Sequence, residues 1–296
     1  MVYGCAMKPN KILYTLSTNY AGSHFLTLQL ASHSKCISVG ELHRLDPNKT
    51  KNKQSCHICK TDDECPVFKG LHGLPLNQLH NNLLNNIESS FAGVDTLIDN
   101  SKKTVWANKL QDLPGISSKY VHIIRDPRAL VRRWMMNYDT AREKNKVRRL
   151  ISRRIWPHFW DILTKSEANV YAWKWVHQNK LITDFLSKNQ LDHKIYTYDE
   201  LVFEPDRVLS EIMLFLGHNY EPAQKEYWNF THHGSQKPQY MKPPKDGNRT
   251  FDIRWKEYLS QETQQEIFNH PAINKYLDSM GIHMGENGLL WREETK

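Results

Sequence analysis

The sequence has no long hydrophobic run, and this absence excludes a membrane-spanning protein. No apolar stretch in its 296 residues approaches the roughly 18–20 residues that a transmembrane helix needs. The first residues, MVYGCAMKP, also lack the apolar core of a signal peptide and the arginine-rich pattern of a transit peptide. We therefore expect a cytoplasmic protein with no membrane partner.

A disulfide framework is also missing. Five cysteines are an odd number, and in a chain of this length without a secretory signal they argue against a disulfide-framed secreted fold. Three of them lie close together in the segment CHICKTDDECPVF, namely Cys56, Cys59 and Cys65. A closed tetrahedral zinc site needs four ligands, and the fourth could come from His43, His57 or His72. Because the C-x2-C-x5-C spacing is unusual for zinc, we favour free or redox-linked thiols that brace a loop, and we expect no metal site.

The third absence concerns the loop STNYAGSHF, from Ser17 to Phe25, which does not end in Gly-Lys-Ser/Thr. That missing lysine reaches the terminal phosphates in kinases and NTPases, so a kinase is disfavoured. The loop still joins a strand-like apolar run to a helical segment, and Gly22 allows an anion to approach the backbone closely. The N–H groups of residues 21–24 and the hydroxyl of Ser23 would then bind a phosphate. A plain turn capped by Ser23 is the alternative interpretation.

Positive charge, in contrast, is abundant. The net charge of +8 favours anionic partners such as nucleotides, sulfated or phosphorylated small molecules, or nucleic acid. Seven cations and one acid lie in REKNKVRRLISRR, residues 142–154, which we interpret as a solvated helix face. Contact with a phosphate backbone is the alternative. The spacing of the aromatic residues that follow favours helix packing in the core, for Trp156, Phe159, Trp160, Trp173 and Trp175.

Strand-length apolar runs alternate with segments of helical periodicity along the chain. The predicted strands are 12–16, 36–39, 96–99, 120–124 and 194–197, and the predicted helices are 23–31, 103–111, one that starts at 127, 167–186 and 205–216. This alternation predicts an α/β fold with a mostly parallel sheet and helices on both faces, in three layers. We expect one domain over residues 1–296. Within it, 45–79 is a cysteine-containing insertion, 219–252 a possible lid and 282–296 a loose surface tail.

The polar residues of interest follow the predicted strands. Ligands of parallel sheets bind beyond the carboxyl ends of the strands. The loop 17–23, Glu41, the pair 101–102 and Arg125 all fall at such ends. This convergence predicts one anion-binding site built from four separate segments.

Three further motifs follow the loop along the chain. IIRDPRALVRRW, residues 123–134, places Arg125 directly after a predicted buried strand. LIDNSKKTVWANKL contains Lys102, and YTYDELVFEPDRVLSEIMLFLG covers residues 196–217. In their order along the chain, the loop, LIDNSKKTVWANKL (residues 97–110), IIRDPRALVRRW and the last motif resemble the sulfotransferases that use 3′-phosphoadenosine 5′-phosphosulfate (PAPS), over about residues 11–255.

The resemblance implies the nucleotide-kinase-like, P-loop-like fold of that family and a set of donor-binding residues. The loop would grip the 5′-phosphosulfate, Arg125 would hold the 3′-phosphate bidentately, and Tyr198 would lie near the adenine. The donor-binding residues implied in this way are Asn19, Tyr20, Ala21, Gly22, Ser23, His24, Phe25, Arg125, Arg133 and Tyr198.

Two catalytic residues are implied as well. Lys102 would neutralise the charge that develops on the oxygen bridging phosphorus and sulfur. Glu41, in VGEL after the second predicted strand, is similar in place to the base of the tyrosylprotein sulfotransferases. A solvated loop acid is the alternative for Glu41. The runner-up bases are His33, His43 and His122.

Two positions depart from the family's pattern. Tyr20 stands where the family usually carries Arg or Lys, so Lys102, Lys103 or His24 would have to supply the cation. Arg133 stands where the family places a phosphate-binding serine. An arginine there could still bind a 3′-phosphate, with more charge and less specific hydrogen bonding.

The function implied is transfer of a sulfonate group from PAPS to a hydroxyl or amine of a small or medium-sized acceptor, with 3′,5′-adenosine bisphosphate (PAP) as product. Such an in-line displacement needs positioning and charge stabilisation, and it requires no metal. We expect a small-molecule partner and no nucleic acid. The alternative is a basic nucleic-acid-binding protein that uses residues 142–154 and the cysteine segment.

Overall fold

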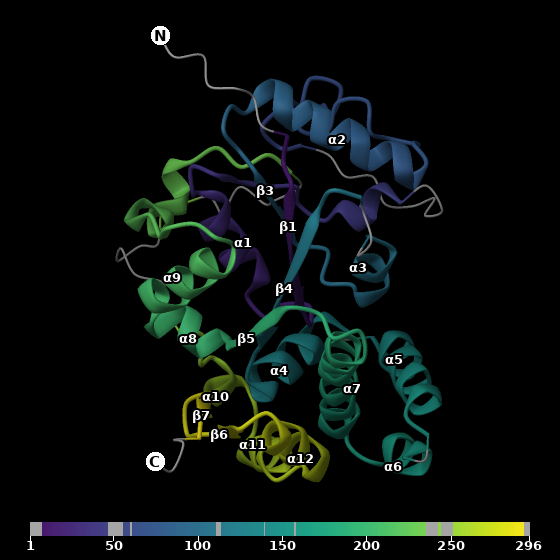
Figure 1. Ribbon diagram of the computed structural model, residues 1–296. Helices are drawn as coiled ribbons and strands as arrows, with labels where there is room; N and C mark the ends of the chain where they lie inside the picture. Colours follow the sequence, from purple (N-terminus) through teal and green to yellow (C-terminus); the bar gives the residue numbers. More distant parts are fainter. Residues whose placement is uncertain are drawn as a thin grey trace.

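Five parallel strands form the centre of the fold (Figure 1). The structure, a computed structural model, describes residues 8–46, 56–59, 61–110, 114–138, 140–156, 158–234, 242–243 and 251–292. The strands are β1 (Lys11–Ser17), β2 (Cys36–Ser38), β3 (Thr96–Asp99), β4 (Ser117–Ile124) and β5 (His193–Thr197), in the sheet order β2-β3-β1-β4-β5. All five predicted strands are therefore confirmed.

Every pair of neighbouring strands in this sheet is parallel, so their carboxyl ends share one edge. The central strand β1 pairs with β3 on one side and with β4 on the other. The loop after β1, Glu41, Lys102, Arg125 and Tyr198 all follow strands at this edge. The predicted convergence of the four segments is thus built into the sheet.

Helices cover both faces of the sheet, as predicted from the alternation of elements. Alternate strand residues point to opposite faces. Leu13 of β1 belongs to the core cluster shared with α1 (Ser23–Ala31) and α9 (Pro205–Phe215). Its neighbours Ile12 and Tyr14 belong to the cluster shared with α2 (Leu76–Ser90), α3 (Thr104–Leu110) and α7 (Glu167–Lys188). Figure 1 shows α1 and α9 on one side of the strands and α3 and α7 on the other.

A third core cluster extends the structure beyond the sheet. It joins α4 (Pro127–Asn137) and α7 to α10 (Trp255–Tyr258), α11 (Gln261–Phe268) and α12 (Pro271–Ser279). The remaining helices are α5 (Ala141–Arg154), α6 (Phe159–Thr164) and α8 (Tyr198–Phe203), with 3-10 segments η1 (Leu42–Leu45) and η2 (Pro222–Asn229). No helix within the described ranges is long and apolar enough to cross a bilayer.

The tail differs from the expectation of a loose segment. Residues 282–291 form the antiparallel pair β6 (Ile282–Met284) and β7 (Leu289–Trp291). Arg128 donates to the backbone carbonyl of Gly285 at 2.8 Å, and the N–H of Leu289 donates to Oδ1 of Asp199 at 2.9 Å. The tail therefore docks on side chains that lie far away in sequence, which a local pattern does not reveal.

Asp199 under this hairpin predicts a pH-dependent stability. Burial raises the pKa of Asp199 to about 7, with the charge of Asp126 adding to the shift, and Oδ2 of Asp199 is buried without a hydrogen-bond partner among the described residues. Because the unfolded value is about 3.9, the stability linked to this group is complete below pH 4 and is lost as the pH rises to 7. Asp199→Asn should therefore gain about 1–3 kcal/mol relative to the wild type between pH 4 and pH 8.

Urea denaturation of both proteins at the two pH values measures this change. Asp184→Asn, at an exposed position of α7, is the matched control and should show no such pH-dependent gain. A difference between Asp199→Asn and the wild type that stays constant with pH would contradict the assignment.

Candidate active site

The loop between β1 and α1 has a backbone that only particular residues tolerate. Tyr20 has a φ of 73°, and Gly22, the N-cap residue of α1, has a φ of 103°. A Cβ atom at Gly22 would lie 2.6 Å from Cδ2 of Tyr198. Gly22 thus provides both the left-handed turn and the space in which the Tyr198 ring packs against the loop.

Gly22→Ala should therefore be costly. The positive φ and the overlap with Tyr198 together should lower the free energy of unfolding by about 1–3 kcal/mol. Gly281→Ala is the matched control, since Gly281 has a φ of 70° but no atom within 4 Å of the added methyl group. Thermal or urea unfolding of both variants measures the difference, and equal losses would show that the Tyr198 contact contributes nothing.

Arg125 contacts the middle of this loop. Its Nη1 donates to the backbone carbonyl of Tyr20 at 2.7 Å, and its guanidinium lies 4.1 Å from the centre of the Tyr198 ring. The indole of Trp175 on α7 donates to the backbone carbonyl of Arg125 at 2.9 Å and so fixes the main chain there. The Nε of Arg125 is buried and has no partner within the described part of the chain. Arg125, Tyr198 and Gly22 therefore form one group.

Asp252 is a member of this group that the sequence analysis missed. Its Oδ2 accepts from Nη2 of Arg125 at 2.8 Å, and its Oδ1 accepts from Nε of Arg254 at 2.6 Å. Burial opposes ionisation of Asp252, but the two guanidinium groups outweigh it and hold its pKa well below the usual range. A carboxylate thus contacts the guanidinium that was expected to bind a phosphate. Since 127 positions separate the two residues, no local signal pointed to the pair.

Aromatic rings extend the group around Tyr198. The ring of Phe251 is nearly parallel to that of Tyr198, with centroids 5.9 Å apart and an interplanar angle of 19°. Phe203 lies against Phe251, with centroids 4.7 Å apart. The predicted adenine contact at Tyr198 therefore has flat apolar neighbours that the motif did not indicate.

The two departures from the family pattern lie next to each other. The guanidinium of Arg133 lies 4.9 Å from the centre of the Tyr20 ring, and the amide of Asn137 donates to the Tyr20 hydroxyl at 2.8 Å. Tyr20 therefore links the loop to α4 and brings a cation close to it. Arg128 in the same helix has a structural role, because it pairs with buried Asp126 and stacks on Trp255 at 3.9 Å.

Glu41 and Lys102 form the second group, as the resemblance implied. Nζ of Lys102 lies 2.6 Å from Oε1 of Glu41, and Nε of Arg44 lies 2.5 Å from Oε2. Both Glu41 and Lys102 are largely buried. Burial alone would raise the pKa of Glu41, but hydrogen bonds and charges from His24, Lys102 and Arg44 lower it well below the usual range. Glu41 is therefore ionised and tightly paired in this state.

His24 connects this group to α1. Its Nε2 lies 3.3 Å from Nζ of Lys102 and 3.6 Å from Oε1 of Glu41, and its Nδ1 lies 2.9 Å from the amide nitrogen of Asn100. Burial is the main cause that lowers the pKa of His24 from its ordinary value, while the neighbouring Glu41 opposes this shift. Lys102 is one of the residues expected to supply the positive charge that is absent at Tyr20, and it reaches His24 in the first turn of α1.

Asp99 shapes the turn that presents Lys102, and the sequence analysis did not single it out. Its Oδ1 accepts from the backbone N–H of Ser101 at 2.8 Å, and its Oδ2 accepts from the indole of Trp106 at 2.8 Å. Lys102 itself has a φ of 58°, which is a strained value for a residue with a side chain. Asp99 is therefore a positioning residue for Lys102.

The runner-up bases have structural surroundings. His122 is fully buried, its Nε2 lies 3.2 Å from Oδ1 of Asn179, and burial lowers its pKa to about 4. Nε2 of His33 lies 2.8 Å from the backbone carbonyl of Asn219. His43 lies buried in η1. Glu41 is the candidate base that lies beside Lys102.

The possible lid at 219–252 is only partly described. Residues 235–241 and 244–250 lie outside the described residues, and with them Lys237, Lys245 and Arg249. The described first half packs against the body of the protein, since Gln224 of η2 donates to the backbone carbonyl of Gln29 in α1 at 3.1 Å. His232 is likewise buried, with its Nε2 2.9 Å from the carbonyl of Tyr227. This half is a docked element rather than a cover.

The cysteine segment closes on a histidine that was not among the three expected. Nδ1 of His233 lies 3.6, 3.4 and 3.6 Å from the sulfurs of Cys56, Cys59 and Cys65. His43, His57 and His72 do not belong to the cluster of metal-binding groups found among the described residues.

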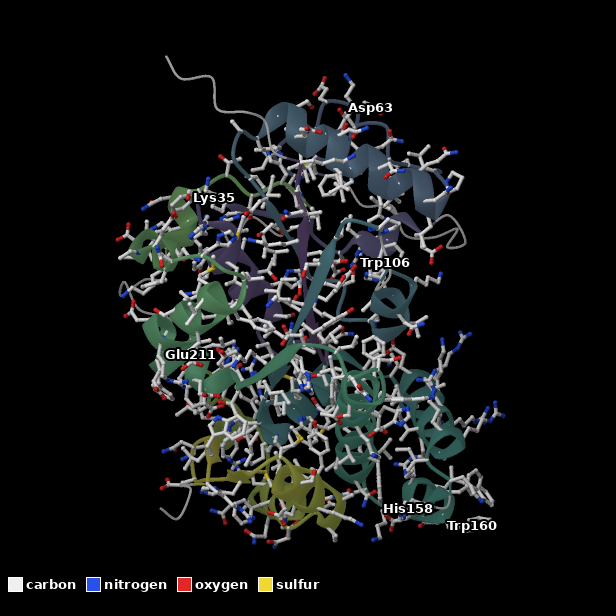
Figure 2. The ribbon with its side chains drawn as sticks, in the orientation of Figure 1. Lys35, Asp63, Trp106, His158, Trp160 and Glu211 are labelled. Carbon is white, nitrogen blue, oxygen red and sulfur yellow. The ribbon has the colours of Figure 1, made fainter. Side chains whose placement is uncertain are left out.

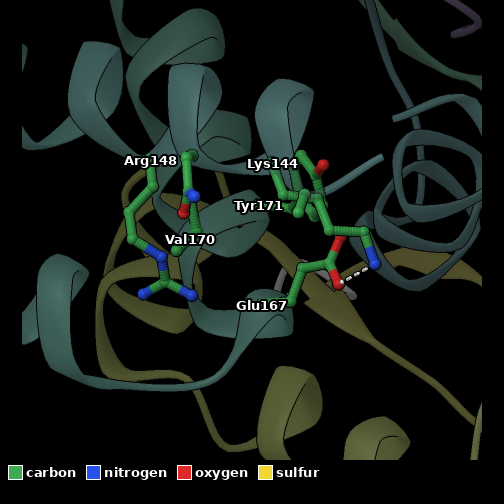
Figure 3. Close-up of a pocket in the computed structure, with 7 residues that line it drawn as sticks. Lys144, Arg148, Glu167, Val170 and Tyr171 are labelled. Carbon is green, nitrogen blue, oxygen red and sulfur yellow. Dashed lines mark ion pairs between the residues drawn. The ribbon is translucent and has the colours of Figure 1, made fainter. Parts of the chain in front are cut away.

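The basic stretch forms α5, and part of it serves internal contacts. Nη1 of Arg148 donates to the backbone carbonyls of Ile162, Leu163 and Lys165 at the end of α6. Lys144 pairs with Glu167 at 2.9 Å. Figure 3 shows this pair beside a hollow of about 220 Å³ between α5 and α7, which contains none of the predicted site residues.

The aromatic residues after the basic stretch divide into two sets. Trp173 and Trp175 are buried, as expected for core residues. Trp156 and Trp160 are 76% and 71% exposed, so the expectation of a core position is wrong for these two. Figure 2 shows Trp160 at the outer side of α6. Trp160 lies on the short helix α6, where Ile162 is the buried position, and Trp156 lies in the turn before that helix.

Comparison with known proteins gives matches in structure only. No family model matches the sequence, and no curated protein matches it. The sulfotransferase domain from the curacin biosynthetic pathway superposes with a TM-score of 0.53 at 19% identity, over 88% of this chain and 96% of that domain.

Two weaker matches are also sulfotransferases. They are the sulfotransferase domain of the Synechococcus PCC 7002 olefin synthase (TM-score 0.48, 15% identity, 94% of this chain and 97% of that one) and a sulfotransferase from Alicyclobacillus acidocaldarius (TM-score 0.42, 16% identity, 74% and 89%). At such low sequence identities, a structural match supports a shared fold only. The match that supports the fold here is the curacin domain, which has a TM-score of 0.53. The resemblance expected from the sequence motifs is thus confirmed at the level of architecture, and the chain has the P-loop-like α/β fold of the sulfotransferases.

Proposed function

We propose that the protein transfers a sulfonate group from PAPS to a hydroxyl or amine of a small or medium-sized acceptor and releases PAP. The observation that carries this proposal is the placement of two charged groups against one segment, the β1–α1 loop and the first turn of α1. Arg125 contacts the carbonyl of Tyr20, and Lys102 contacts His24 four residues later. A fold does not determine an activity, so these side chains, and not the fold, support the proposed reaction.

The first group suits the nucleotide end of PAPS. The buried Nε of Arg125 has no partner in the described chain, and its Nη2 binds a carboxylate, that of Asp252. A 3′-phosphate is also an anion, with more negative charge and more oxygens than a carboxylate, so it can replace Asp252 and accept from two nitrogens of the fork. The Tyr198 ring beside Gly22 offers a flat surface for adenine. The N-terminus of α1 favours the anionic 5′ end.

The second group suits the transfer itself. In the reaction, the bond between sulfur and the bridging oxygen of PAPS breaks while sulfur bonds to the acceptor's oxygen or nitrogen. Lys102 would stabilise the negative charge on the departing oxygen, and Glu41 would take the acceptor's proton. The expulsion of water and the alignment of the two substrates supply much of the remaining rate.

The ion pair between these two residues suggests how the base becomes active. Glu41 has a pKa well below its usual range because His24, Lys102 and Arg44 stabilise its charge against the cost of burial. Such a carboxylate is a weak base. When Lys102 turns toward the bridging oxygen, Glu41 loses one of these partners and its basicity rises. Donor binding would thereby activate the base.

The nucleic-acid alternative has less support. Its two features do not share a surface, because the cysteine segment packs in the core cluster under α2 while α5 packs on α6 and α7 (Figure 1). Arg148 and Lys144 of the basic helix already have protein partners.

Turnover of PAPS tests the proposal. The protein is incubated with PAPS and a panel of phenols, aliphatic alcohols and amines, and PAP release and sulfonated products are followed by chromatography and mass spectrometry. We expect product with at least one acceptor class and little product from Glu41→Gln, whereas Arg142→Ala, at an exposed position of α5, should remain active. No product with any acceptor, together with no thermal stabilisation by PAP, would contradict the proposal.

A further inference from the structure

The cluster of three cysteines and one histidine has the dimensions of a metal site. Its four potential ligand atoms all lie within 4.8 Å of one another, and the three sulfurs lie at nearly equal distances of 3.4–3.6 Å from Nδ1 of His233. A ring nitrogen carries one hydrogen or one lone pair, so it cannot form three hydrogen bonds. In tetrahedral zinc with bonds of about 2.3 Å to sulfur and 2.0–2.1 Å to nitrogen, the sulfur–nitrogen edge is about 3.6 Å. The observed distances match that edge.

Backbone N–H groups surround two of the sulfurs. Those of Ile58, Cys59 and Gly234 point at the sulfur of Cys56, and those of Val67 and Phe68 point at the sulfur of Cys65. Donors around a sulfur orient it as a ligand. A metal ion makes this arrangement favourable, because it supplies the positive charge that buried thiolates need.

The segment that carries the cysteines needs an additional constraint. Residues 56–59 and 61–74 have no helix or strand, yet Cys56, Cys65, Val67, Phe68 and Leu71 are buried in the core cluster under α2. The segment meets the chain after η2 through the N–H of His57, which donates to the carbonyl of Gly234 at 3.1 Å. Irregular segments with few regular hydrogen bonds are commonly held by disulfides or metals. Cys56, Cys59 and Cys65 are free thiols in the structure, so no disulfide among them supplies this constraint.

We propose that Cys56, Cys59, Cys65 and His233 bind one structural zinc ion. Three thiolates and one imidazole select a soft or borderline cation such as Zn²⁺ over Mg²⁺ or Ca²⁺, and four protein ligands leave no open position for substrate. This replaces the sequence-based preference for free or redox-linked thiols. The inference does not depend on the transfer reaction.

The zinc site also lies close to the loop that bears Glu41. A Cβ atom at Gly234 would lie 3.8 Å from Cα of Gly40, and the carbonyl of Gly40 accepts from the N–H of Asn100 at 2.8 Å. The ion would therefore hold the cysteine segment and the residues His233 and Gly234 against the two loops that carry Glu41 and Lys102. Its role is to brace the site from outside.

Metal analysis of the full chain, purified without chelators, tests the proposal. Inductively coupled plasma mass spectrometry should find about one zinc per chain, as expected for one four-ligand site. The variants Cys65→Ser and His233→Ala should lose the zinc, and His233→Cys should retain it because it restores a fourth ligand. His57→Gln, an exposed histidine of the same segment, is the matched control and should keep the full content.

Cobalt substitution provides a measurement that does not depend on variants folding. Wild-type protein loaded with Co²⁺ should show the visible absorption of a tetrahedral cobalt–thiolate site and the near-ultraviolet thiolate charge-transfer band. Removal of the zinc should lower the melting temperature, and added zinc should restore it. Wild-type protein that holds no zinc and takes up none, or that contains a disulfide within residues 56–65, would overturn the proposal. Zinc content undiminished in both Cys65→Ser and His233→Ala would overturn it as well.

Discussion

Lys102→Met is expected to lower kcat for sulfonate transfer by about 10²–10³-fold, the loss typical of removing one group that stabilises developing charge. Lys102 is the buried cation 2.6 Å from the proposed base and 3.3 Å from the first turn of α1, so no solvated side chain can take its place. Because it acts mainly on the departing oxygen, the KM for PAPS should change much less than kcat. Initial rates at saturating PAPS, with the fold verified by circular dichroism, measure the effect.

The control for this experiment is Lys180→Met, which removes an exposed lysine of α7 that pairs with Asp184. Its kcat should equal that of the wild type. A Lys102→Met protein that is folded and keeps kcat within about threefold of the wild type would show that Lys102 does not stabilise the transition state.

Arg125→Ala is expected to weaken PAP binding by about 10²-fold and to leave 5′-AMP binding nearly unchanged, because a bidentate guanidinium–phosphate contact contributes about 3 kcal/mol. The PAP affinity of Arg125→Lys should lie between those of the wild type and Arg125→Ala, since lysine keeps the positive charge but cannot form the bidentate contact. Calorimetric titration of each protein with both nucleotides measures the selectivity for the 3′-phosphate.

Asp252 provides a second test of the same contact. Its carboxylate occupies Nη2 of Arg125 at 2.8 Å, so a 3′-phosphate has to displace it. Asp252→Asn should therefore bind PAP more tightly than the wild type, and the same change made in Arg125→Ala should have no effect on affinity. Equal loss of PAP and 5′-AMP affinity in Arg125→Ala would mean that Arg125 supports the loop rather than the phosphate.

Much of the fold could be predicted because its signals are local. The five strands are short apolar runs bounded by polar or turn residues, and the observed bounds of β3 are those predicted, Thr96–Asp99. Helix α2 was missed along its whole length, because no predicted helix overlaps Leu76–Ser90. Its run of Asn residues has low helix propensity, while burial of Leu79, Leu83 and Ile87 on one face stabilises it. This helix therefore depends on tertiary packing, which the sequence of the segment alone does not reveal.

The site divides in the same way. The placement of Glu41, Lys102 and Arg125 at one edge could be predicted because each comes within three residues after a strand, whereas Tyr198 was implied by the family resemblance. Asp252 and His233 could not, since their partners lie 127 and at least 168 positions away in the sequence. Asp99 could not be predicted for another reason, because it affects Lys102 only through the turn at Ser101 that it stabilises. Residues that act through a long-range partner or through a neighbour leave no periodic signal.

The most direct test of the central claim is calorimetric titration of the wild-type protein with PAP, alongside 5′-AMP, ATP and a short DNA duplex. We predict tight binding of PAP, much weaker binding of 5′-AMP, and binding of DNA that is weak and disappears with added salt. A protein that shows no preference for PAP over 5′-AMP, and that binds the duplex more tightly than either, would contradict the sulfotransferase account and favour the basic helix α5 as the functional surface.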